Sequence, residues 1–346
     1  MPLRVAIVLP PREAYAPAAA GAVAQVARSH ARFGSAAATV YGRRVAEPFP
    51  EPFHPLPGWA YGPALALALR RDQPDLVEVH NRPELARALA RRHRTALLLH
   101  NDPQAMRGLQ TAAQRRTLAA RVQIRAVSAW VAERFGPEAH ILPNGIDMPP
   151  PADPARENTV LFAGRMVADK GADLFVAACA RALSALPGWR ARMLGADRFG
   201  ADSPETPFLR RLRPAARAAG VELAGWQPHE AVQQEMRRAA LLVMPGRWPE
   251  PFGLVALEAM AAGTALLYAP AGALPEVVGE AGLAIDPQDS DALAAAIVAL
   301  ARDPARRAAF GAAGRARAAA FAMPAIVRRL DALRGDAWHA APPRPI

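Results

Sequence analysis

The 346-residue sequence predicts an α/β protein of two tandem, doubly wound Rossmann-like domains, because short apolar segments alternate with helical segments twice along the chain. Strands separated by helices form a parallel sheet that is covered on both faces. Between the two series lies a proline-rich stretch, residues 148–156, which is the expected linker. Ligands of such sheets bind beyond the carboxyl ends of the strands, so we expect the strand ends of the two domains to face one another across a cleft.

The first series, residues 1–147, predicts an N-terminal Rossmann-like domain. Its expected strands are short apolar runs at residues 4–9, 36–41, 75–79, 95–99, 122–127 and 140–142. Its expected helices are residues 18–33, 61–71, 83–92, 104–121 and 129–135. Residues 47–58 are so rich in proline that we expect neither element there.

The second series, residues 148–320, predicts a C-terminal domain of the same kind. Its expected strands are residues 159–163, 189–194, 221–223, 240–244, 264–268 and 282–285. Its expected helices are residues 172–186, 207–219, 229–238, 252–262, 289–302 and 304–321. In the remaining segment, residues 321–346, we expect a helix at 324–334 that packs back on the N-terminal domain, followed by a flexible proline-rich tail.

Composition limits the class of protein. No apolar run approaches the roughly 20 residues of a membrane span, and the N-terminus lacks a signal-peptide pattern, so we expect a soluble cytoplasmic protein. The single cysteine, Cys179, lies in a helical apolar pattern and is expected in the core.

The net charge of +11 is uneven along the chain. Residues 1–145 hold 19 Arg against 10 Asp and Glu, a charge of +9, and the rest holds 23 basic and 21 acidic residues, a charge of +2. A basic N-terminal half suits peripheral contact with an anionic membrane at its inner face, or a phosphorylated acceptor, although a solvated surface is an equal alternative. We expect no nucleic-acid partner, because no binding motif is present and aromatic residues are sparse.

The stretch 244–263, MPGRWPEPFGLVALEAMAAG, predicts a strand end, a loop and a helix that carry two carboxylates eight residues apart, Glu250 and Glu258. Gly253 would let a ligand approach the backbone, and the amides of Gly253 and Leu254 would face an anion at the helix start. An anion site flanked by two acids suits a nucleotide-sugar. The alternative is a strand-loop-helix unit with two surface glutamates.

A second motif, GRMVADKG at 164–171, follows a buried strand and precedes a helix. Its two glycines frame a turn with two cations, Arg165 and Lys170, and Lys170 is the only lysine of the chain. Across a tight turn both cations can converge on one diphosphate, whose departure as a leaving group they would assist. A solvated turn is the alternative.

These features resemble the GT-B glycosyltransferases, in particular the retaining enzymes of glycosyltransferase family 4. The resemblance rests on GRMVADKG, on PEPFGLVALEAMAAG some 80 residues later, and on PNGID at 143–147, which matches the segment leading between the domains. It is strongest from about residue 140 to 290. It implies transfer of a hexose-type sugar from a nucleoside-diphosphate donor, UDP- or GDP-linked, to an acceptor hydroxyl with retention of configuration.

The resemblance also implies roles in the donor-binding domain. Arg165 and Lys170 would hold the diphosphate, and Glu250, a catalytic candidate, would contact sugar hydroxyls near the reacting carbon. No cofactor and no metal are expected, because the family usually needs none and the sequence shows no metal-ligand cluster. The other donor-binding candidates are the amides of Gly253 and Leu254, at the sugar or distal phosphate, and Glu258, at the ribose hydroxyls.

The N-terminal half departs from the family pattern, because one glycine, Gly21, stands where many members have a pair. Gly21 is nevertheless a candidate for backbone contact with a phosphate. His100, at a strand end, resembles the family histidine near sugar and acceptor and is the second catalytic candidate. Domain closure would bring Gly21 and His100 to the donor. The acceptor-side candidates are Asn81, Arg82, Asn101 and Asp102, whereas His80 and His93 are expected to be structural.

The sequence therefore predicts a glycosyltransferase that acts on a glycan or glycolipid acceptor, in the synthesis of cell-envelope polysaccharide, lipopolysaccharide or glycolipid. Two alternatives stay open: a sugar-nucleotide epimerase on the same fold, and a non-catalytic protein with a vestigial nucleotide-sugar site. A dinucleotide dehydrogenase is disfavoured, since no G-x-G-x-x-G motif follows the first strand of either domain.

Overall fold

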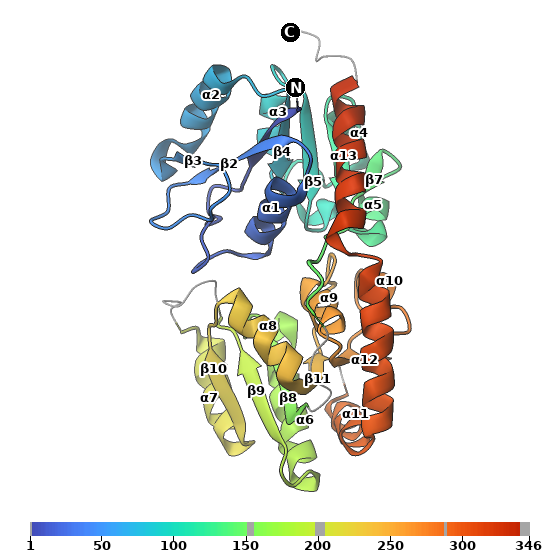
Figure 1. Cartoon of the computed structure of the whole chain (residues 1–346). Helices are drawn as coiled ribbons and strands as arrows, with labels where there is room; N and C mark the ends of the chain where they lie inside the picture. The colour runs from blue at the N-terminus through green and yellow to red at the C-terminus, as the bar shows by residue number, and fades with distance from the viewer. Residues whose placement is uncertain (1, 151–155, 198–204, 287–288, 340–346) are drawn as a thin grey trace. The chain divides into compact units, whose positions relative to one another are not determined.

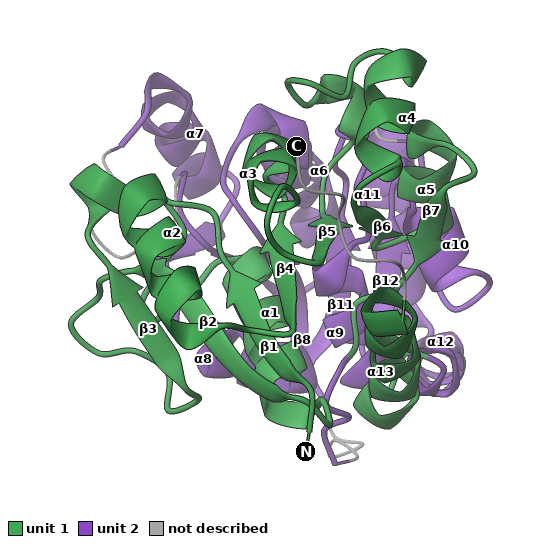
Figure 2. Ribbon diagram, turned by 90° about the horizontal axis from the view of Figure 1, so that it is seen from above, with its two compact units in different colours: residues 1–145, 321–346 green, residues 146–320 purple. Residues whose placement is uncertain are grey.

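The protein divides into two compact units in a computed structural model that describes residues 2–150, 156–197, 205–286 and 289–339 (Figure 1). Unit 1 comprises residues 1–145 and 321–346, and unit 2 comprises residues 146–320. The boundary between the units after residue 145 thus falls two residues before the expected domain boundary after residue 147. The C-terminal segment shares the colour of the N-terminal residues in Figure 2, because it belongs to the same unit.

The described part of unit 1 forms a seven-stranded parallel sheet in the order β3-β2-β1-β4-β5-β6-β7. The right-handed crossovers place α1 on one face and α2 and α3 on the other, as Figure 1 shows. The strands are β1 (Arg4–Val8), β2 (Ala37–Arg43), β3 (Phe53–Leu56), β4 (Leu76–His80), β5 (Thr95–Leu99), β6 (Gln123–Ala126) and β7 (Ala139–Ile141). The helices are α1 (Ala22–Phe33), α2 (Tyr61–Asp72), α3 (Pro83–Leu89), α4 (Ala112–Ala119), α5 (Ala129–Phe135) and α13 (Met323–His339).

Several boundaries in unit 1 differ from the sequence-based expectation. Strand β3 lies in the stretch where we expected none, and it tolerates Pro55 because it is the edge strand of the sheet. Helix α1 begins at Ala22 rather than residue 18, and α4 covers only eight residues of the expected 104–121. Helix α13 extends to His339, so residues 335–339 are helical rather than part of a flexible tail, and the rest of that tail lies outside the described residues.

The described part of unit 2 forms a six-stranded parallel sheet in the order β10-β9-β8-β11-β12-β13. A short helix, α10, was not expected from the sequence, and most of the expected linker, residues 151–155, lies outside the described residues. The strands are β8 (Glu157–Ala163), β9 (Arg190–Leu194), β10 (Val221–Gly225), β11 (Ala239–Met244), β12 (Ala265–Tyr268) and β13 (Leu283–Ala284). The helices are α6 (Ala172–Ala182), α7 (Pro207–Ala218), α8 (His229–Arg238), α9 (Leu254–Ala261), α10 (Leu274–Val278), α11 (Ser290–Arg302) and α12 (Pro304–Ala319).

The interior of unit 2 is apolar, and the prediction that Cys179 belongs to its core is confirmed. Cys179 is fully buried on α6 and packs with side chains such as Phe175, Val160 and Ile297. Burial raises the pKa of its thiol, which keeps it protonated and unreactive.

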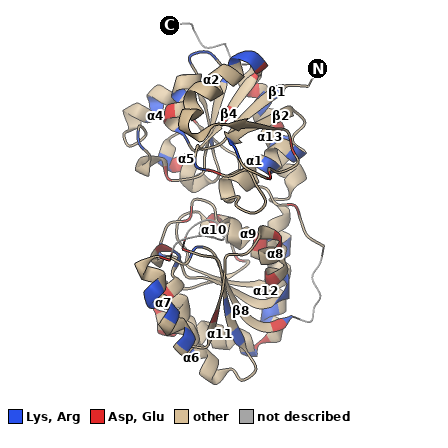
Figure 3. Ribbon diagram, turned by 90° about the vertical axis from the view of Figure 1, so that its left-hand side faces the viewer, with Lys and Arg blue, Asp and Glu red and all other residues tan. Residues whose placement is uncertain are grey.

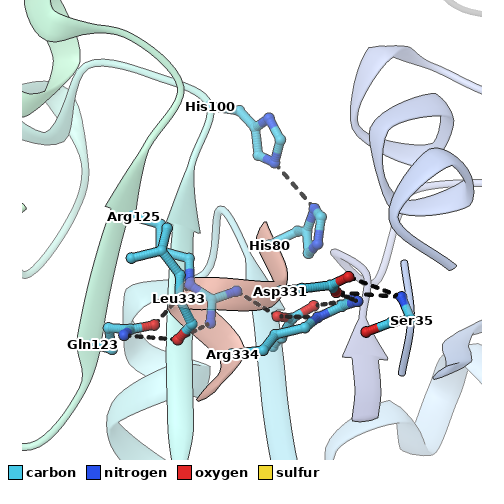
Figure 4. A network of polar contacts seen from close by, with 9 residues as sticks. Ser35, His80, His100, Gln123, Arg125, Asp331, Leu333 and Arg334 are labelled. Atoms are coloured by element: carbon cyan, nitrogen blue, oxygen red, sulfur yellow. Dashed lines mark hydrogen bonds and ion pairs between the residues drawn. The ribbon is translucent and has the colours of Figure 1, made fainter. Parts of the chain in front are cut away.

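The interior of unit 1 holds a buried charge cluster that attaches α13 to the sheet (Figure 4). Arg334 of α13 donates to both carboxylate oxygens of Glu78 on β4, at 3.0 Å from Nε and 2.8 Å from Nη2. Arg125 on β6 pairs with the same carboxylate, and its Nη2 donates to the carbonyl of Leu333 at 3.3 Å. At the same helix, Asp331 accepts from the backbone amide of Ser35 at 3.1 Å.

Charged side chains outside these interiors are spread over both units. Figure 3 shows basic segments on helices of both units, α7 among them. No described helix combines the length with the apolar character that a membrane span requires.

Candidate functional site

Two loops at the carboxyl end of the unit 2 sheet are joined by hydrogen bonds. The turn after β8 ends at Gly171, whose φ of +70° favours glycine and whose missing Cβ leaves room for the carbonyl of Pro245 in the loop after β11. The amides of Arg247 and Trp248 in that loop both donate to the carbonyl of Asp169, at 2.9 and 3.1 Å. The two sequence motifs, some 80 residues apart, therefore form one local structure.

An ion pair between Lys170 and Glu250 links the same two loops. The side chains are 25% and 14% exposed, so the pair lies at the surface of the loops but is largely shielded. The backbone holds Glu250 in place, because its carbonyl accepts from the amide of Ala273 at 2.7 Å. An ammonium group has three donors. Lys170 can therefore keep Glu250 as a partner and still donate to an anionic ligand.

Arg165, the other expected diphosphate ligand, is exposed on the turn that also carries Lys170. Its neighbour Met166 is buried and anchors the turn, with its amide donating to the carbonyl of Ala196 at 2.8 Å. The structure thus places both cations on one anchored turn, and their convergence on a single anion stays a prediction.

The start of α9 has the geometry of an open helix N-terminus. Gly253 is its N-cap residue with φ +92° and no side-chain cap, and the first amides of a helix, beginning with Leu254, have no partner within it. The space that a Cβ of Gly253 would need is filled by the side chain of Leu274 on α10. The glycine is therefore required by its backbone conformation and by this packing, and the approach of a ligand to its backbone stays a prediction. The amides themselves stay candidates for anion contact.

Glu258 on α9 pairs with a residue that sequence reasoning missed, His229. Its carboxylate lies 2.7 Å from His229 Nε2, and the carboxylate side chain is 14% exposed. His229 is the first residue of α8. Its position directly after Pro228, at a predicted helix start, was the signal in the sequence that could have marked it as a candidate. Glu250 and Glu258 have different partners, and their contact with one ligand is untested.

His100 follows β5 in unit 1 and is held by two side chains of the neighbouring strand end. Its amide donates to Oδ1 of Asn81 at 3.2 Å, and its Nε2 lies 3.0 Å from Nδ1 of His80 (Figure 4). Asn81 has a φ of +57°, which asparagine tolerates better than most residues. Burial, and then the neighbouring His80, keep the pKa of His100 well below its usual range, so the ring is neutral at physiological pH.

Gly21, at the start of α1, already has a partner for its amide. Oε1 of Glu13 accepts from the amide of Gly21 at 3.0 Å and from that of Ala24 at 3.4 Å. Burial raises the pKa of Glu13, partly offset by these two amides. A phosphate could use the Gly21 amide only after Glu13 has moved, so this site residue stays a prediction.

The acceptor-side candidates have mixed surroundings. Asp102 accepts from the amide of Gln104 at 2.9 Å and pairs with Arg134 Nη2 at 2.6 Å, and Asn81 positions His100, so both have structural contacts. Arg82 and Asn101 are exposed at strand ends. Among the described residues, no group of three or more His, Cys, Asp or Glu side chains could hold a metal ion.

Solved structures with similar folds span nearly the whole chain. HepE of Anabaena in complex with UDP matches with a TM-score of 0.77 at 19% identity, covering 96% of this chain and 100% of HepE. Sucrose-phosphate synthase of Thermosynechococcus elongatus matches with a TM-score of 0.75 at 22% identity, covering 98% and 100%. The two parallel α/β units together therefore have the GT-B fold.

The family comparison concerns unit 2 in particular. Residues 146–317, nearly all of unit 2, match the family model described as glycosyl transferases group 1.

Known relatives match between 51% and 59% of the chain. An exopolysaccharide phosphotransferase of Streptomyces coelicolor is 34% identical over 215 residues, 59% of this chain and 22% of that protein. A D-inositol 3-phosphate glycosyltransferase of Segniliparus rotundus is 35% identical over 192 residues, 54% and 42%. The glycogen synthase of Mycobacterium tuberculosis is 33% identical over 188 residues, 51% and 43%. The chain thus spans less than half the length of these relatives.

Proposed function

We propose that this protein is a retaining, metal-independent glycosyltransferase that moves a sugar from a nucleoside-diphosphate donor to an acceptor hydroxyl. The observation that carries the proposal is the Lys170–Glu250 ion pair, which joins the motifs at 164–171 and 244–263 in one local structure, within the region that matches the glycosyl transferases group 1 model. Lys170 would neutralise the diphosphate, and Glu250 would accept hydrogen bonds from the sugar.

This reaction requires groups that stabilise negative charge on the diphosphate, and candidates for this role lie at the carboxyl end of the unit 2 sheet. The bond between the anomeric carbon and the departing phosphate oxygen breaks while the acceptor oxygen bonds to that carbon on the same face. Negative charge develops on the diphosphate as its bond to the anomeric carbon breaks, and the departing phosphate oxygen takes the acceptor proton. Lys170, Arg165 and the amides at the start of α9 would stabilise that charge, which is the work of a metal ion in other enzymes.

Glu258 would bind the ribose of the donor. A carboxylate accepts hydrogen bonds only, and two vicinal hydroxyl groups can donate to its two oxygens. His229 Nε2, at 2.7 Å, already orients one of these oxygens. The base is proposed as uracil or guanine: structural neighbours were solved with UDP and UDP-glucose, and a Corynebacterium glutamicum relative, 32% identical over 44% of this chain, is GDP-mannose-dependent.

The acceptor is proposed as a glycan or glycolipid of the cell envelope. This part rests on the names of relatives, which include an exopolysaccharide phosphotransferase and a phosphatidylinositol monomannoside mannosyltransferase. We further propose a cytoplasmic location with peripheral contact to an anionic membrane, on the +9 charge of residues 1–145. Binding to anionic vesicles at low and high salt tests that contact.

The first test is thermal stabilisation by UDP, GDP, ADP and dTDP, each with and without EDTA, because a ligand of the folded state raises the melting temperature. We expect one nucleotide to raise the melting temperature equally with and without EDTA. We expect Lys170→Ala to abolish this increase. No shift with any nucleotide would favour the vestigial-site alternative.

Mass spectrometry of products after incubation with the matching nucleotide-sugar then separates transfer to an acceptor from epimerisation of the donor. The anomeric configuration of the product tests retention.

A further inference from the structure

We propose that His80, which the sequence presents as a structural residue, is a positioning residue that fixes the tautomer of His100, so that His100 presents a donating Nδ1–H group to a substrate oxygen. The inference rests on the proposed function for its catalytic consequence. The tautomer itself is inferred from the contact between the two rings and from the surroundings of His80 in unit 1.

The contact between the rings leaves two possible arrangements. His100 Nε2 and His80 Nδ1 are 3.0 Å apart, so one nitrogen carries the proton and the other accepts it. If His80 donates, His100 is the Nδ1–H tautomer. If His100 donates, His80 must carry its own proton on Nε2.

The surroundings of His80 decide between these arrangements. His80 is fully buried, and its Nε2 has no hydrogen-bond partner among the described residues. A buried N–H group without an acceptor is rarer in proteins than an acceptor without a donor. The proton therefore belongs on His80 Nδ1, which donates to His100.

The ionisable groups around His80 do not oppose this arrangement. The groups that act on His80 are His30 of α1, Glu78 of β4, Arg125 of β6 and Arg334 of α13, and its ring also contacts His100. Glu78 pairs with both guanidinium groups and Asp331 pairs with Arg334, so the charges of the cluster balance and the hydrogen bonding of His80 decides its tautomer. Burial lowers the pKa of both His30 and His80 to about 3, so neither ring adds a charge at neutral pH.

The consequence for His100 is a restricted role. Its only lone pair, on Nε2, is engaged by His80, and its backbone amide is held by Asn81. The ring therefore cannot accept a proton from an acceptor hydroxyl without losing that contact. It can donate from Nδ1 to a sugar hydroxyl or phosphate oxygen, so His100 stabilises substrate rather than acting as a base.

The direct test is the imidazole nitrogen–proton NMR spectrum of the whole protein with nitrogen-labelled histidine, near neutral pH and without substrate. We expect His100, assigned by loss of its signals in His100→Asn, to show the Nδ1–H pattern, and His80 to show the same pattern. An Nε2–H pattern for His100 in the wild-type protein would overturn the proposal. Because no substrate is present, this result does not depend on the proposed function.

Two variants of His80 test the positioning role. His80→Phe keeps the ring volume and removes the donor, so we expect His100 to lose its single tautomer and kcat to fall about tenfold or more with little change in KM. His80→Asn places an amide donor near the position of Nδ1, and we expect it to restore the tautomer and most of kcat. Unchanged tautomer and kcat in His80→Phe would refute the role.

A third variant separates a positioning effect from general damage. His93→Asn replaces a half-buried histidine of the same unit, outside the buried cluster, and should leave both the His100 spectrum and kcat unchanged. If His80→Phe does not fold, the spectra of the wild-type protein and of His80→Asn still decide the question, because a mixed tautomer in His80→Asn would contradict the assigned donor.

Discussion

The two units share one fold plan but place their ionisable side chains differently. Unit 1 buries Glu78, Arg125 and Arg334 beside two histidines in the interior next to its sheet. Unit 2 has an apolar core, and its pairs Lys170–Glu250 and His229–Glu258 lie in the loops and helices that follow its strands. Buried charges are costly unless fully paired, so removal of one partner is strongly destabilising. The two pairs of unit 2 are partly exposed, so they keep part of their hydrogen-bonding capacity and can serve ligands. The comparison suggests that ionic contacts hold unit 1 together and are available for chemistry in unit 2.

The largest expected effect breaks the attachment in unit 1. Glu78→Gln removes the carboxylate that pairs with both guanidinium groups, so two buried cations lose their counter-charge, and we expect a loss of about 3–5 kcal/mol in unfolding free energy. Urea denaturation measures it. The matched control is Arg181→Ala in the exposed Arg181–Asp291 pair of unit 2, which should cost less than about 1 kcal/mol. Equal effects of the two variants would mean that the buried cluster is not an attachment point.

The next effect concerns the pair of unit 2, where we expect loss of activity without loss of folding. Lys170→Ala and Glu250→Ala should each lower kcat/KM about a hundredfold or more, because each removes a group proposed to act in the transition state. The double variant should lose less than the product of the two single losses, since the side chains are paired. Steady-state kinetics and circular dichroism test this together. Wild-type turnover in either single variant would remove its role.

A smaller effect is expected at the proposed ribose contact. Glu258→Gln keeps one acceptor oxygen but loses the charge, so nucleotide binding should weaken about tenfold. Calorimetric titration with the nucleotide selected by the thermal-shift test measures the change. Asp291→Asn, an exposed carboxylate change elsewhere in unit 2, is the matched control and should bind as wild type does. Undiminished affinity in Glu258→Gln would exclude ribose recognition by this side chain.

The buried histidines of unit 1 should make the stability of the protein depend on pH. His30 and His80 have pKa values near 3 in the folded protein, lowered chiefly by burial, against about 6.5 in the unfolded chain. Below pH 6.5 the unfolded state therefore binds more protons than the folded state. As the pH is lowered from about 6.5, the unfolding free energy should fall by up to about 1.4 kcal/mol per pH unit for each histidine. Glu78, whose pKa is held well below normal by Arg334 and Arg125 despite burial, adds to this loss at lower pH.

Chemical denaturation between pH 7 and pH 4, with His30→Phe as the comparison, measures this slope. Replacement of one histidine should reduce the slope between pH 6 and pH 4. A flat profile for the wild-type protein would show that the histidines take up protons while folded.

The smallest expected effect lies at the start of α1. Glu13→Ala removes the carboxylate that accepts from the amides of Gly21 and Ala24, so stability should fall by about 1 kcal/mol, as for loss of a helix cap. If Gly21 contacts a phosphate, the same variant should leave nucleotide affinity equal or higher, because Glu13 no longer competes for the amide. A clear loss of nucleotide affinity would argue against competition at this site.

The two parallel α/β units could be predicted from the sequence alone, because helical and strand periodicities alternate wherever both faces of a sheet are covered. It also located the loops that carry Lys170 and Glu250, since both loops directly follow predicted strands. Boundaries were less certain: β3 was missed because prolines are tolerated at a sheet edge, and α4 was overextended because its alanine-rich composition favours helix without specifying contacts.

Which side chains meet could not be predicted from the sequence and is seen in the tertiary structure. The partners in Lys170–Glu250, His229–Glu258 and His80–His100 are 80, 29 and 20 residues apart, and local periodicity carries no information about such pairs. The carboxylate of Glu13 on the Gly21 amide and the bidentate pairing of Glu78 with Arg334, 256 residues away, likewise depend on how the elements pack. Periodicity reports which face of an element is buried, whereas the partner on that face is fixed by the assembly of distant segments around a common core.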